Sequence, residues 1–342
     1  MKARNVRLKL NYNSKDISTD IAPYLLSFQF SDKTSGEADD IQINLEDRDK
    51  LWESEWFPNK GDTIEAFFII ENWESAGKTE VQLGVFEIDE IEISGLPHAV
   101  SIKAISVPNN NDLRGIQRNK AWEKVKLSQI AQEIAEKAGL KLYLNLTDDE
   151  EIERLEQREE SDLEFLTKTA KEKGCGVKVS DTQLDVYSIA ELDKAESVAI
   201  IKRNSAGITS YRFQSKTRDI YKGAHVRYEN AKDGVFIEYT FNDPDKKEGK
   251  ILEIHKNVAD QKEAEKLAKS ELRDKNKDEI KGSLNFGGKP AIGDNLFLAG
   301  FTITLEGFNR LDGKYIVESS NHSLSNSGYA CGIEIRKCLN GY

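Results

Sequence analysis

Long apolar stretches are missing from this sequence. A membrane-spanning helix needs roughly 18 consecutive and mostly apolar residues, whereas the longest clean apolar run here covers residues 66–70. The amino-terminal segment, MKARNVRLKLNYN, also lacks the apolar core that a secretory signal peptide requires. We therefore predict neither insertion into a membrane nor export by a cleaved signal.

Cysteine and positive charge are scarce as well. The 342 residues include three cysteines, and this odd number favours a reducing, cytosolic origin over a disulfide framework. Asp and Glu outnumber Lys and Arg by 60 to 49, which gives a formal net charge of −11. This balance disfavours specific nucleic-acid binding through a basic surface. It is compatible with an acidic wall beside DNA, because such a wall would repel the phosphate backbone.

Familiar catalytic motifs are also absent. The sequence holds no H-E-x-x-H, no G-x-S-x-G and no pair of C-x-x-C motifs. Residues 282–294 resemble a phosphate-binding loop only superficially. Gly288 stands where that motif requires Lys, and Pro290 follows Lys289 where it requires Ser or Thr. We interpret this segment as a tight turn between strands.

One set of side chains has the chemistry of a zinc site. His322, Cys331 and Cys338 could coordinate zinc if the strands bring them together. Their spacing fits no familiar site, and buried cysteines usually pack as small hydrophobic residues. We therefore predict no catalytic residue, no cofactor and no metal ligand.

Acidic and tryptophan side chains leave alternatives open. The acidic run 147–164 is either a solvated connector or the source of a glycosidase-like carboxylate pair, and we favour the connector because charge runs normally face water. Trp52, Trp56, Trp73 and Trp122 would suit either sugar stacking or packing in a core or an oligomer contact. We favour packing.

The first hundred or so residues have the alternating pattern of strands. Clear examples are residues 41–47, 84–94 and 98–108, and a phase slip in the second predicts a bulge between Asp89 and Glu90. Short strands at this spacing are typical of a small barrel or sandwich. The polar run 108–115 then marks the first boundary.

A helical period follows this boundary. Residues 126–140 predict a helix that stops at Gly139, and a strand and the acidic run follow it. Ser161 is placed to cap a second helix, with Glu164 completing a capping box and Gly174 as the residue after its end. A hairpin that turns near Asp181 completes a compact α+β unit.

Strands return in the last third and are interrupted by one helix, capped by Asp260 and Glu263. The chain is thus expected to be α+β and mainly β. We predict a first β-barrel-like tube domain over 1–108, an α+β helical unit over 109–196, and a second β-barrel-like tube domain with one helix over 197–342.

The segments 121–142 and 157–187 resemble the phage late-control D family, the baseplate hub proteins of contractile phage tails and tailocins. They are also similar to the N-terminal hub part of the type VI secretion spike VgrG. The Gln-x-x-Glu-Ser-Asp-x-x-Phe-Leu core is the most specific part, and weaker similarity spans nearly the whole chain. The family-motif residues, which the resemblance identifies as structural, are Trp122, Gln157, Glu160, Ser161, Asp162, Phe165, Leu166 and Gly174.

This resemblance implies a structural role without catalysis. Family members look like trimers in which each subunit gives two similar barrels to a ring, so that the ring can meet a six-fold tail tube and a three-fold spike. It implies as partners two further copies of the chain, a spike protein, the tail tube or a tube-initiator protein, the baseplate wedge proteins and the tape measure protein. Because the chain ends at Tyr342 soon after the last predicted strand, we expect the spike to be a separate protein.

The resemblance also implies synthesis in the bacterial cytoplasm and incorporation into a tail baseplate. It leaves open whether the particle is a phage or a DNA-free bacteriocin. Two alternatives remain at this point, a cell-wall hydrolase of the tail tip and a carbohydrate-binding module that uses the tryptophans.

Overall fold

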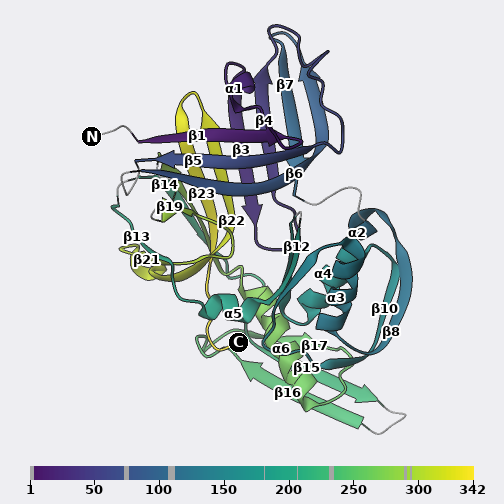
Figure 1. Ribbon diagram of the computed structural model, residues 1–342. Helices are drawn as coiled ribbons and strands as arrows, with labels where there is room; N and C mark the ends of the chain where they lie inside the picture. Colours follow the sequence, from purple (N-terminus) through teal and green to yellow (C-terminus); the bar gives the residue numbers. More distant parts are fainter. Residues whose placement is uncertain are drawn as a thin grey trace.

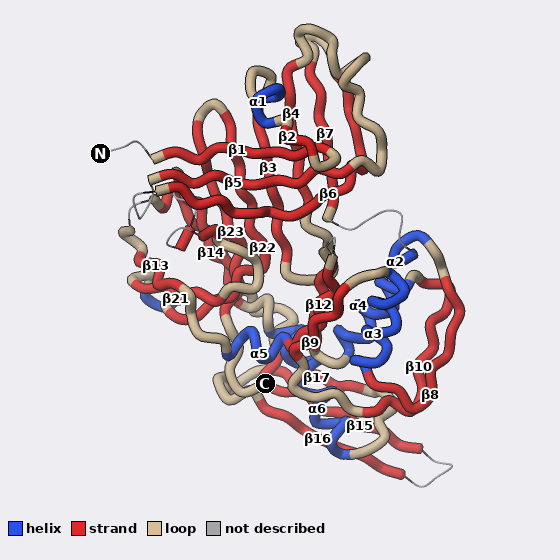
Figure 2. Tube along the Cα trace, viewed as in Figure 1, coloured by secondary structure: helices blue, strands red, loops and turns tan. Residues whose placement is uncertain are grey.

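The computed structural model describes residues 4–72, 77–106, 112–180, 182–205, 207–230, 235–288, 291–292 and 295–342. Trp73, the expected boundary at 108/109, the predicted turn at Asp181 and the Lys289–Pro290 pair lie outside the described residues. Strands dominate the chain, with helices between them, which confirms an α+β fold that is mainly β (Figures 1 and 2). Within the described parts, strand pairing does not close either β-rich part into a barrel.

The N-terminal part is a curved antiparallel sheet. Its strands follow the order β3–β4–β7–β6–β5–β1–β2. The ladder between β6 and β7 shifts register between Ile88 and Glu90, which confirms a bulge at the predicted phase slip. The elements are β1 (Asn5–Tyr12), β2 (Lys15–Asp16), α1 (Ser18–Ile21), β3 (Leu25–Lys33), β4 (Asp40–Glu46), β5 (Thr63–Glu71), β6 (Lys78–Ser94) and β7 (Ala99–Ile105).

The C-terminal strands continue this same sheet. β22 pairs antiparallel with β3, so that strands from both ends of the chain form one 13-stranded sheet with a shared apolar core. Figure 1 shows the yellow β22 and β23 beside the purple β3. The elements are β13 (Ala199–Lys202), β14 (Ile208–Ser215), β18 (Ile280–Gly287), β21 (Thr302–Glu306), η1 (Asn309–Leu311), β22 (Gly313–Ser325) and β23 (Gly328–Lys337). Between β18 and β21, β19 (Ala291–Ile292) and β20 (Asn295–Leu296) form a separate two-stranded sheet.

The turn predicted over 282–294 is wrong in its first half. Residues 282–287 belong to β18, which pairs with β14 on one side and β23 on the other. Its glycines weaken the local strand pattern. A Cβ at Gly282 would come within 2.5 Å of the Phe213 ring, which lies against this backbone.

The central unit has its own core between helices and a small sheet. α3 and α4 pack with the three-stranded sheet β11–β12–β9, and β8 and β10 form a separate antiparallel ribbon. The elements are α2 (Asp112–Gly115), β8 (Arg118–Lys126), α3 (Leu127–Ala138), β9 (Lys141–Asn145), β10 (Glu151–Glu160), α4 (Asp162–Glu172), β11 (Cys175–Val179), β12 (Gln183–Ser188) and α5 (Ile189–Lys194).

The interpretation of the acidic run as a connector is therefore wrong. Residues 151–160 form β10, which pairs along its length with β8. Half of the β10 residues are exposed, as expected for charged residues, and the backbone pairs with β8 along one edge.

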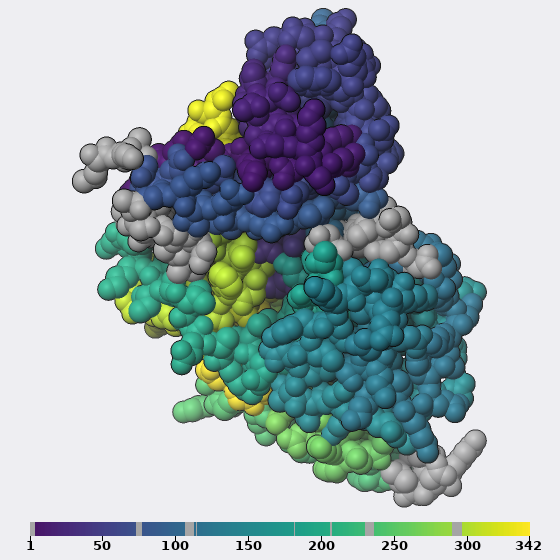
Figure 3. Space-filling view, in the orientation of Figure 1, coloured from purple at the N-terminus to yellow at the C-terminus, as the bar shows by residue number. Residues whose placement is uncertain are grey.

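A third core lies at the far end of the molecule. Helix α6 (Gln261–Asn276) covers one face of the sheet formed by β15 (Tyr221–Asn230), β16 (Val235–Asn242) and β17 (Lys250–Ile254). Asp260 caps α6 by accepting a hydrogen bond from the Glu263 backbone N–H at 2.8 Å, which confirms the cap. The predicted capping box is incomplete, because the Glu263 carboxylate accepts from the Ala259 backbone N–H at 2.7 Å and not from Asp260. Figure 3 shows the N-terminal sheet, the central unit and this α6 part in sequence from top to bottom.

No helix within the described residues is long and apolar enough to cross a bilayer.

Candidate functional site

The motif that carries the resemblance surrounds the start of α4. The Ser161 hydroxyl accepts a hydrogen bond from the Glu164 backbone N–H at 3.3 Å, and the Glu164 carboxylate accepts from the Ser161 backbone N–H at 2.8 Å. Hydrogen bonds that the Ser161 backbone N–H and hydroxyl donate to the Glu164 carboxylate lower the pKa of Glu164. The predicted capping box is thus confirmed. At the other end Gly174 has φ 72°, the left-handed conformation that favours glycine after a helix.

Asp162 is the electrostatic centre of the motif. Its carboxylate is buried, with the side chain 5% exposed, and it lies 2.7 Å from Lys137 Nζ and 3.2 Å from Arg118 Nε. It also accepts a hydrogen bond from Gln157 Nε2 at 2.9 Å. A buried carboxylate requires such partners. Asp162 therefore ties together the end of β10, the start of β8 and the end of α3.

Gln157 and Glu160 fix the chain where β10 ends. Gln157 is buried, and its amide nitrogen donates to the Glu160 carbonyl as well as to Asp162. The Glu160 carboxylate pairs with Lys168, one to two turns into α4. The polar motif residues thus fix the direction in which the chain passes from β10 into α4.

The apolar motif residues join the ribbon to the helix from the other side. The ring of Trp122 in β8 stacks on Phe165 of α4 with centroids 4.8 Å apart and an interplanar angle of 6°. The Trp122 indole N–H donates to Glu133 at 3.2 Å. Leu166 beside them is fully buried. All eight motif residues therefore lie in or at the ends of one helix module, and we define this module as residues 118–174. Their role in family function stays a prediction.

A buried ion cluster fastens the central unit to the large sheet, and sequence analysis missed it. Lys178 in β11 forms ion pairs with Asp32 in β3 and, at 3.1 Å, with Asp39. Burial raises the pKa of Asp39 to about 7, although Lys178 opposes the shift. The Ala299 backbone N–H donates to Asp32 at 2.7 Å, so the C-terminal strands share the cluster.

A second buried cluster joins three parts of the chain. Asp193 in α5 pairs with Arg336 of β23 at 2.7 Å and lies 3.7 Å from Arg273 of α6. All three side chains are buried. Burial lowers the pKa of Arg273, and Asp193 opposes that shift. The three charged residues are isolated and far apart in the sequence. Their spacing is too weak a pattern to predict the cluster.

The acidic run offers ion pairs and no poised general acid. Glu150 contacts Lys262 and Lys266 of α6 at 2.6 and 2.8 Å, and the hydrogen bond from Lys262 leads in lowering its pKa to about 2. Glu156 pairs with Arg154 and Arg158, and its pKa is also lowered. A catalytic acid needs a raised pKa, so these carboxylates fit a structural surface better than a hydrolase centre.

The zinc candidates are engaged in packing. The His322 ring contacts the Tyr329 hydroxyl at 2.6 Å and the Phe297 carbonyl at 3.0 Å, and burial lowers the pKa of His322 to about 4. Cys331 lies opposite His322 in the β22–β23 ladder. Burial raises the pKa of both Cys331 and Cys338 to about 12. Across the described residues, no group of three or more His, Cys, Asp or Glu is arranged to hold a metal ion.

The described tryptophans pack within the protein. Trp52 and Trp122 are buried. Trp56 is half-buried, and its ring meets Trp52 edge to face at a centroid distance of 5.4 Å. Sugar stacking needs an open ring face, and one face of Trp122 is covered by Phe165.

Comparisons with known proteins agree with this structural character. The chain is 26% identical over 231 residues to a probable baseplate hub protein of Escherichia phage 186, which is 66% of this chain and 56% of that protein. It is 30% identical over 171 residues to the probable baseplate hub protein of Escherichia phage P2, which is 50% of this chain and 42% of that protein. The resemblance to the baseplate hub family is confirmed. The chain spans about half the length of these two hub proteins. No family model matches it.

Solved structures show the same fold over almost the entire chain. A tail protein from Neisseria meningitidis covers 97% of this chain and 96% of its own, with a TM-score of 0.73 and 12% identity. A prophage tail protein from Shewanella oneidensis covers 97% and 98%, with a TM-score of 0.73 and 15% identity. An Escherichia coli type VI secretion component, described as structurally similar to phage T4 tail proteins gp27 and gp5, covers 98% and 76%, with a TM-score of 0.56 and 11% identity. The fold of this chain is thus shared with tail proteins and with a type VI secretion component.

Proposed function

We propose that this protein is the structural baseplate hub of a contractile phage tail or tailocin, a trimeric ring that joins the six-fold tail tube to the three-fold spike. The observation that carries the proposal is the combination of curated hub relatives with a tail-protein fold over 97% of the chain. The baseplate wedge proteins and the tape measure protein are further proposed partners, and the spike is proposed to be a separate protein.

The sheet topology supports a symmetry-adapting role. One chain carries an N-terminal and a C-terminal set of strands, joined edge to edge where β3 meets β22. Three copies would therefore present six β-rich parts, which matches a six-fold partner on one side and a three-fold partner on the other. The three parts of the predicted domain division, 1–108, 109–196 and 197–342, would act as first tube domain, helical unit and second tube domain.

The buried clusters support a rigid hub. Lys178 fixes the central unit to the large sheet, and Asp193 links it to β23 and α6. A ring that transmits position from tube to spike requires subunits whose parts keep a fixed arrangement. We propose that the helix module 118–174 grips the spike or a neighbouring subunit, and that its charged ribbon is surface.

The function proposed here involves no catalysis. The hydrolase alternative needs a poised acid, which the paired carboxylates of the acidic run do not supply. The carbohydrate-binding alternative needs an open tryptophan face, and Phe165 covers one face of Trp122. We propose synthesis in the bacterial cytoplasm and incorporation into the tail baseplate. A ring of chains with net charge −11 would place carboxylates along its inner wall, which would not bind passing DNA. A basic inner wall in the assembled ring would contradict this part of the proposal.

Two measurements test the function. Electron microscopy of the assembled particle should locate the chain as a three-fold ring between tube and spike. Native mass spectrometry should give a trimer, either alone or with the spike, since some subunits trimerise only with their partner. A location outside the baseplate, or turnover of peptidoglycan by the purified chain that is lost on changing one carboxylate, would overturn it.

A further inference from the structure

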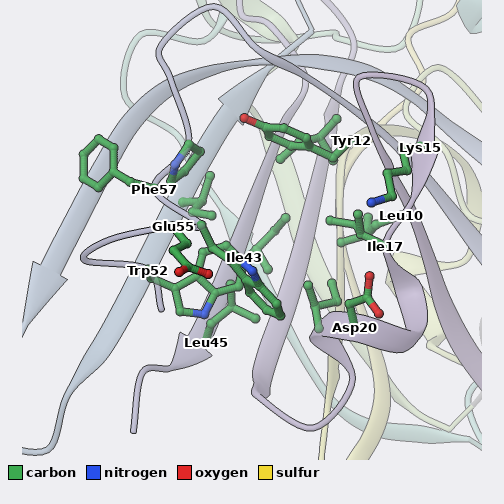
Figure 4. A pocket seen from close by; sticks show the side chains of 15 residues that line it. Leu10, Tyr12, Lys15, Ile17, Asp20, Ile43, Leu45, Trp52, Glu55 and Phe57 are labelled. Carbon is green, nitrogen blue, oxygen red and sulfur yellow. The ribbon is translucent and has the colours of Figure 1, made fainter. Parts of the chain in front are cut away.

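The N-terminal sheet contains an apolar cavity that the proposed hub role does not explain. It has a volume of about 270 Å³ and opens between α1, the ends of β1 and β4, and the loop 47–58 (Figure 4). Its floor is the buried core of the sheet. The apolar lining consists of Leu10, Ile17, Ile21, Ile43, Leu45, Trp52, Trp56, Phe57, Pro58, Ile64 and Ile102.

The cavity has an unused hydrogen-bond donor in its wall. Trp52 is buried, with 6% of its surface exposed, yet its indole N–H has no hydrogen-bond partner among the described residues. A buried indole N–H usually finds an acceptor. The Trp52 N–H is closed off from solvent, so an acceptor in the cavity reaches it only if the ring moves.

One exposed apolar side chain lies at the mouth, and a second lies on the neighbouring β6–β7 hairpin. Phe57 is 50% exposed at the edge of the cavity, and Leu96 at the tip of the β6–β7 hairpin is 86% exposed. The hairpin lies against the loop 47–58, because the Asp47 backbone N–H donates to the His98 carbonyl at 3.0 Å and His98 lies 3.5 Å from Glu53. Cavity and exposed apolar residues therefore occupy one end of the sheet.

We propose that this cavity is the docking site for one large apolar side chain of another tail protein, carried on a loop that has basic residues beside it. The proposal rests on the hub function and names the chemistry of one partner contact. A small molecule that filled the cavity would leave Phe57 and Leu96 in water, whereas a protein loop would cover them around a central anchor.

The layout favours a different protein over a second copy of this chain. A ring of identical copies uses two complementary surfaces on opposite flanks of each copy. Here the cavity and the exposed Leu96 share one end, which suits an end-on partner. Among the residues that line the cavity, Asp20 and Glu55 carry exposed carboxylates against Lys15, and the whole chain is acidic, so a basic loop is complementary. Figure 4 shows Lys15 and Asp20 on one side of the cavity, with Glu55 and Trp52 on the other.

Calorimetric titration of the full-length chain tests the site with blocked pentapeptides. The probe Arg-Gly-Phe-Gly-Arg should bind, and a probe with central Ala should bind about tenfold more weakly, which corresponds to about 1.4 kcal/mol. A probe with Glu in place of both Arg residues should also bind more weakly. Absence of binding by the Phe probe, or equal binding of all three, would overturn the proposal.

Variants of the chain place the binding in the cavity. Ile17→Trp should fill the space and abolish binding, while the matched control Ile93→Trp, on the exposed face of β6, should leave it unchanged. If Ile17→Trp fails to fold, Phe57→Ala at the mouth and Trp52→Phe, which shortens the apolar wall as well as removing the N–H donor, should each weaken binding severalfold. Unchanged binding of the Phe probe in both Phe57→Ala and Trp52→Phe would refute the assignment of the binding site to the cavity.

Sedimentation of the same variants separates the possible occupants. Self-association that is lost in Phe57→Ala would assign the cavity to a second copy and reject a different partner. If the cavity variants enter particles at the normal position and the Phe probe does not bind, the docking proposal fails while the hub function stands. If the chain is absent from the baseplate, the hub function fails.

Discussion

Replacement of Lys178 by Met removes a partly buried cation that lies between two buried carboxylates. Lys178 lies between the carboxylates of Asp32 and Asp39, whose side chains are 5% and 12% exposed. Methionine has a similar length and keeps the aliphatic packing, so the change isolates the charge. Two carboxylates then face each other without a counter-ion at the junction of the central unit and the large sheet.

The expected loss is about 3–5 kcal/mol of unfolding free energy near neutral pH, the range for breaking a buried ion pair from one side. Asp39→Asn should instead raise the unfolding free energy near neutral pH, because it removes one carboxylate and leaves Lys178 paired with Asp32. The double variant Lys178→Met with Asp39→Asn should therefore recover part of the loss.

The pH dependence follows from the raised pKa of Asp39, about 7 in the fold against 3.8 as the usual value. Between these values the folded chain holds a proton that the unfolded chain has released, so this contribution to stability is full below about pH 4 and is lost as pH rises through 7. The difference between these two pKa values of Asp39 corresponds to at most about 4 kcal/mol of unfolding free energy. Asp39→Asn should flatten this slope. The loss in Lys178→Met should shrink near pH 5, where Asp39 is protonated.

Urea unfolding at several pH values measures the global effect, and hydrogen exchange of residues 33–39 and β11 measures it at the junction itself. Lys103→Met, which removes an exposed lysine in β7, serves as the control. It should change neither the unfolding free energy nor the hydrogen exchange at the junction. A loss below about 0.5 kcal/mol in Lys178→Met, the size of an ordinary surface substitution, would refute the reasoning. So would a loss that grows as pH falls.

Three further changes test the helix module. Phe165→Ala should cost about 3–5 kcal/mol in urea unfolding, because a buried ring stacked on Trp122 is lost; a cost under about 1 kcal/mol would mean that the stack carries little stability. Ser161→Ala should cost about 1 kcal/mol by removing the helix cap, and Ser161→Asp should restore most of it, so an equal loss in both would contradict the capping role. Gly174→Ala should cost about 1 kcal/mol because of its positive φ, with Gly115→Ala, which meets no atom within 4 Å and has no positive φ, as the neutral control; equal melting temperatures for the two variants would argue against backbone strain.

Local patterns made the helices of the central unit predictable. The apolar stripe of α3, the capping box at Ser161 and Gly174 after α4 each act within a few residues, so a single sequence contains the whole signal. The same holds for the bulge in β6, where a phase slip shows in the alternation of apolar side chains. These features do not depend on what lies across the core.

Long-range pairing was beyond local patterns. The ribbon β8–β10 is exposed on most of its surface, so its charged residues show no alternation that would identify a strand. The junction of β3 with β22 joins residues 33 and 319, and nothing near either residue specifies the other. Lys178 alternates with valines as an outward-facing residue would, and only the arrival of Asp32 and Asp39 from another part of the chain makes its burial favourable.

The edge-to-edge junction of β3 with β22 also has a mechanical consequence. The hydrogen bonds of an antiparallel ladder run perpendicular to the strands, so a load directed along the strands strains the whole row at the same moment. If a single peptide segment connected the two sets of strands instead, it would carry the load one residue at a time. That segment would extend before a ladder broke. Tension between β3 and β22 is therefore met by many weak bonds acting in parallel.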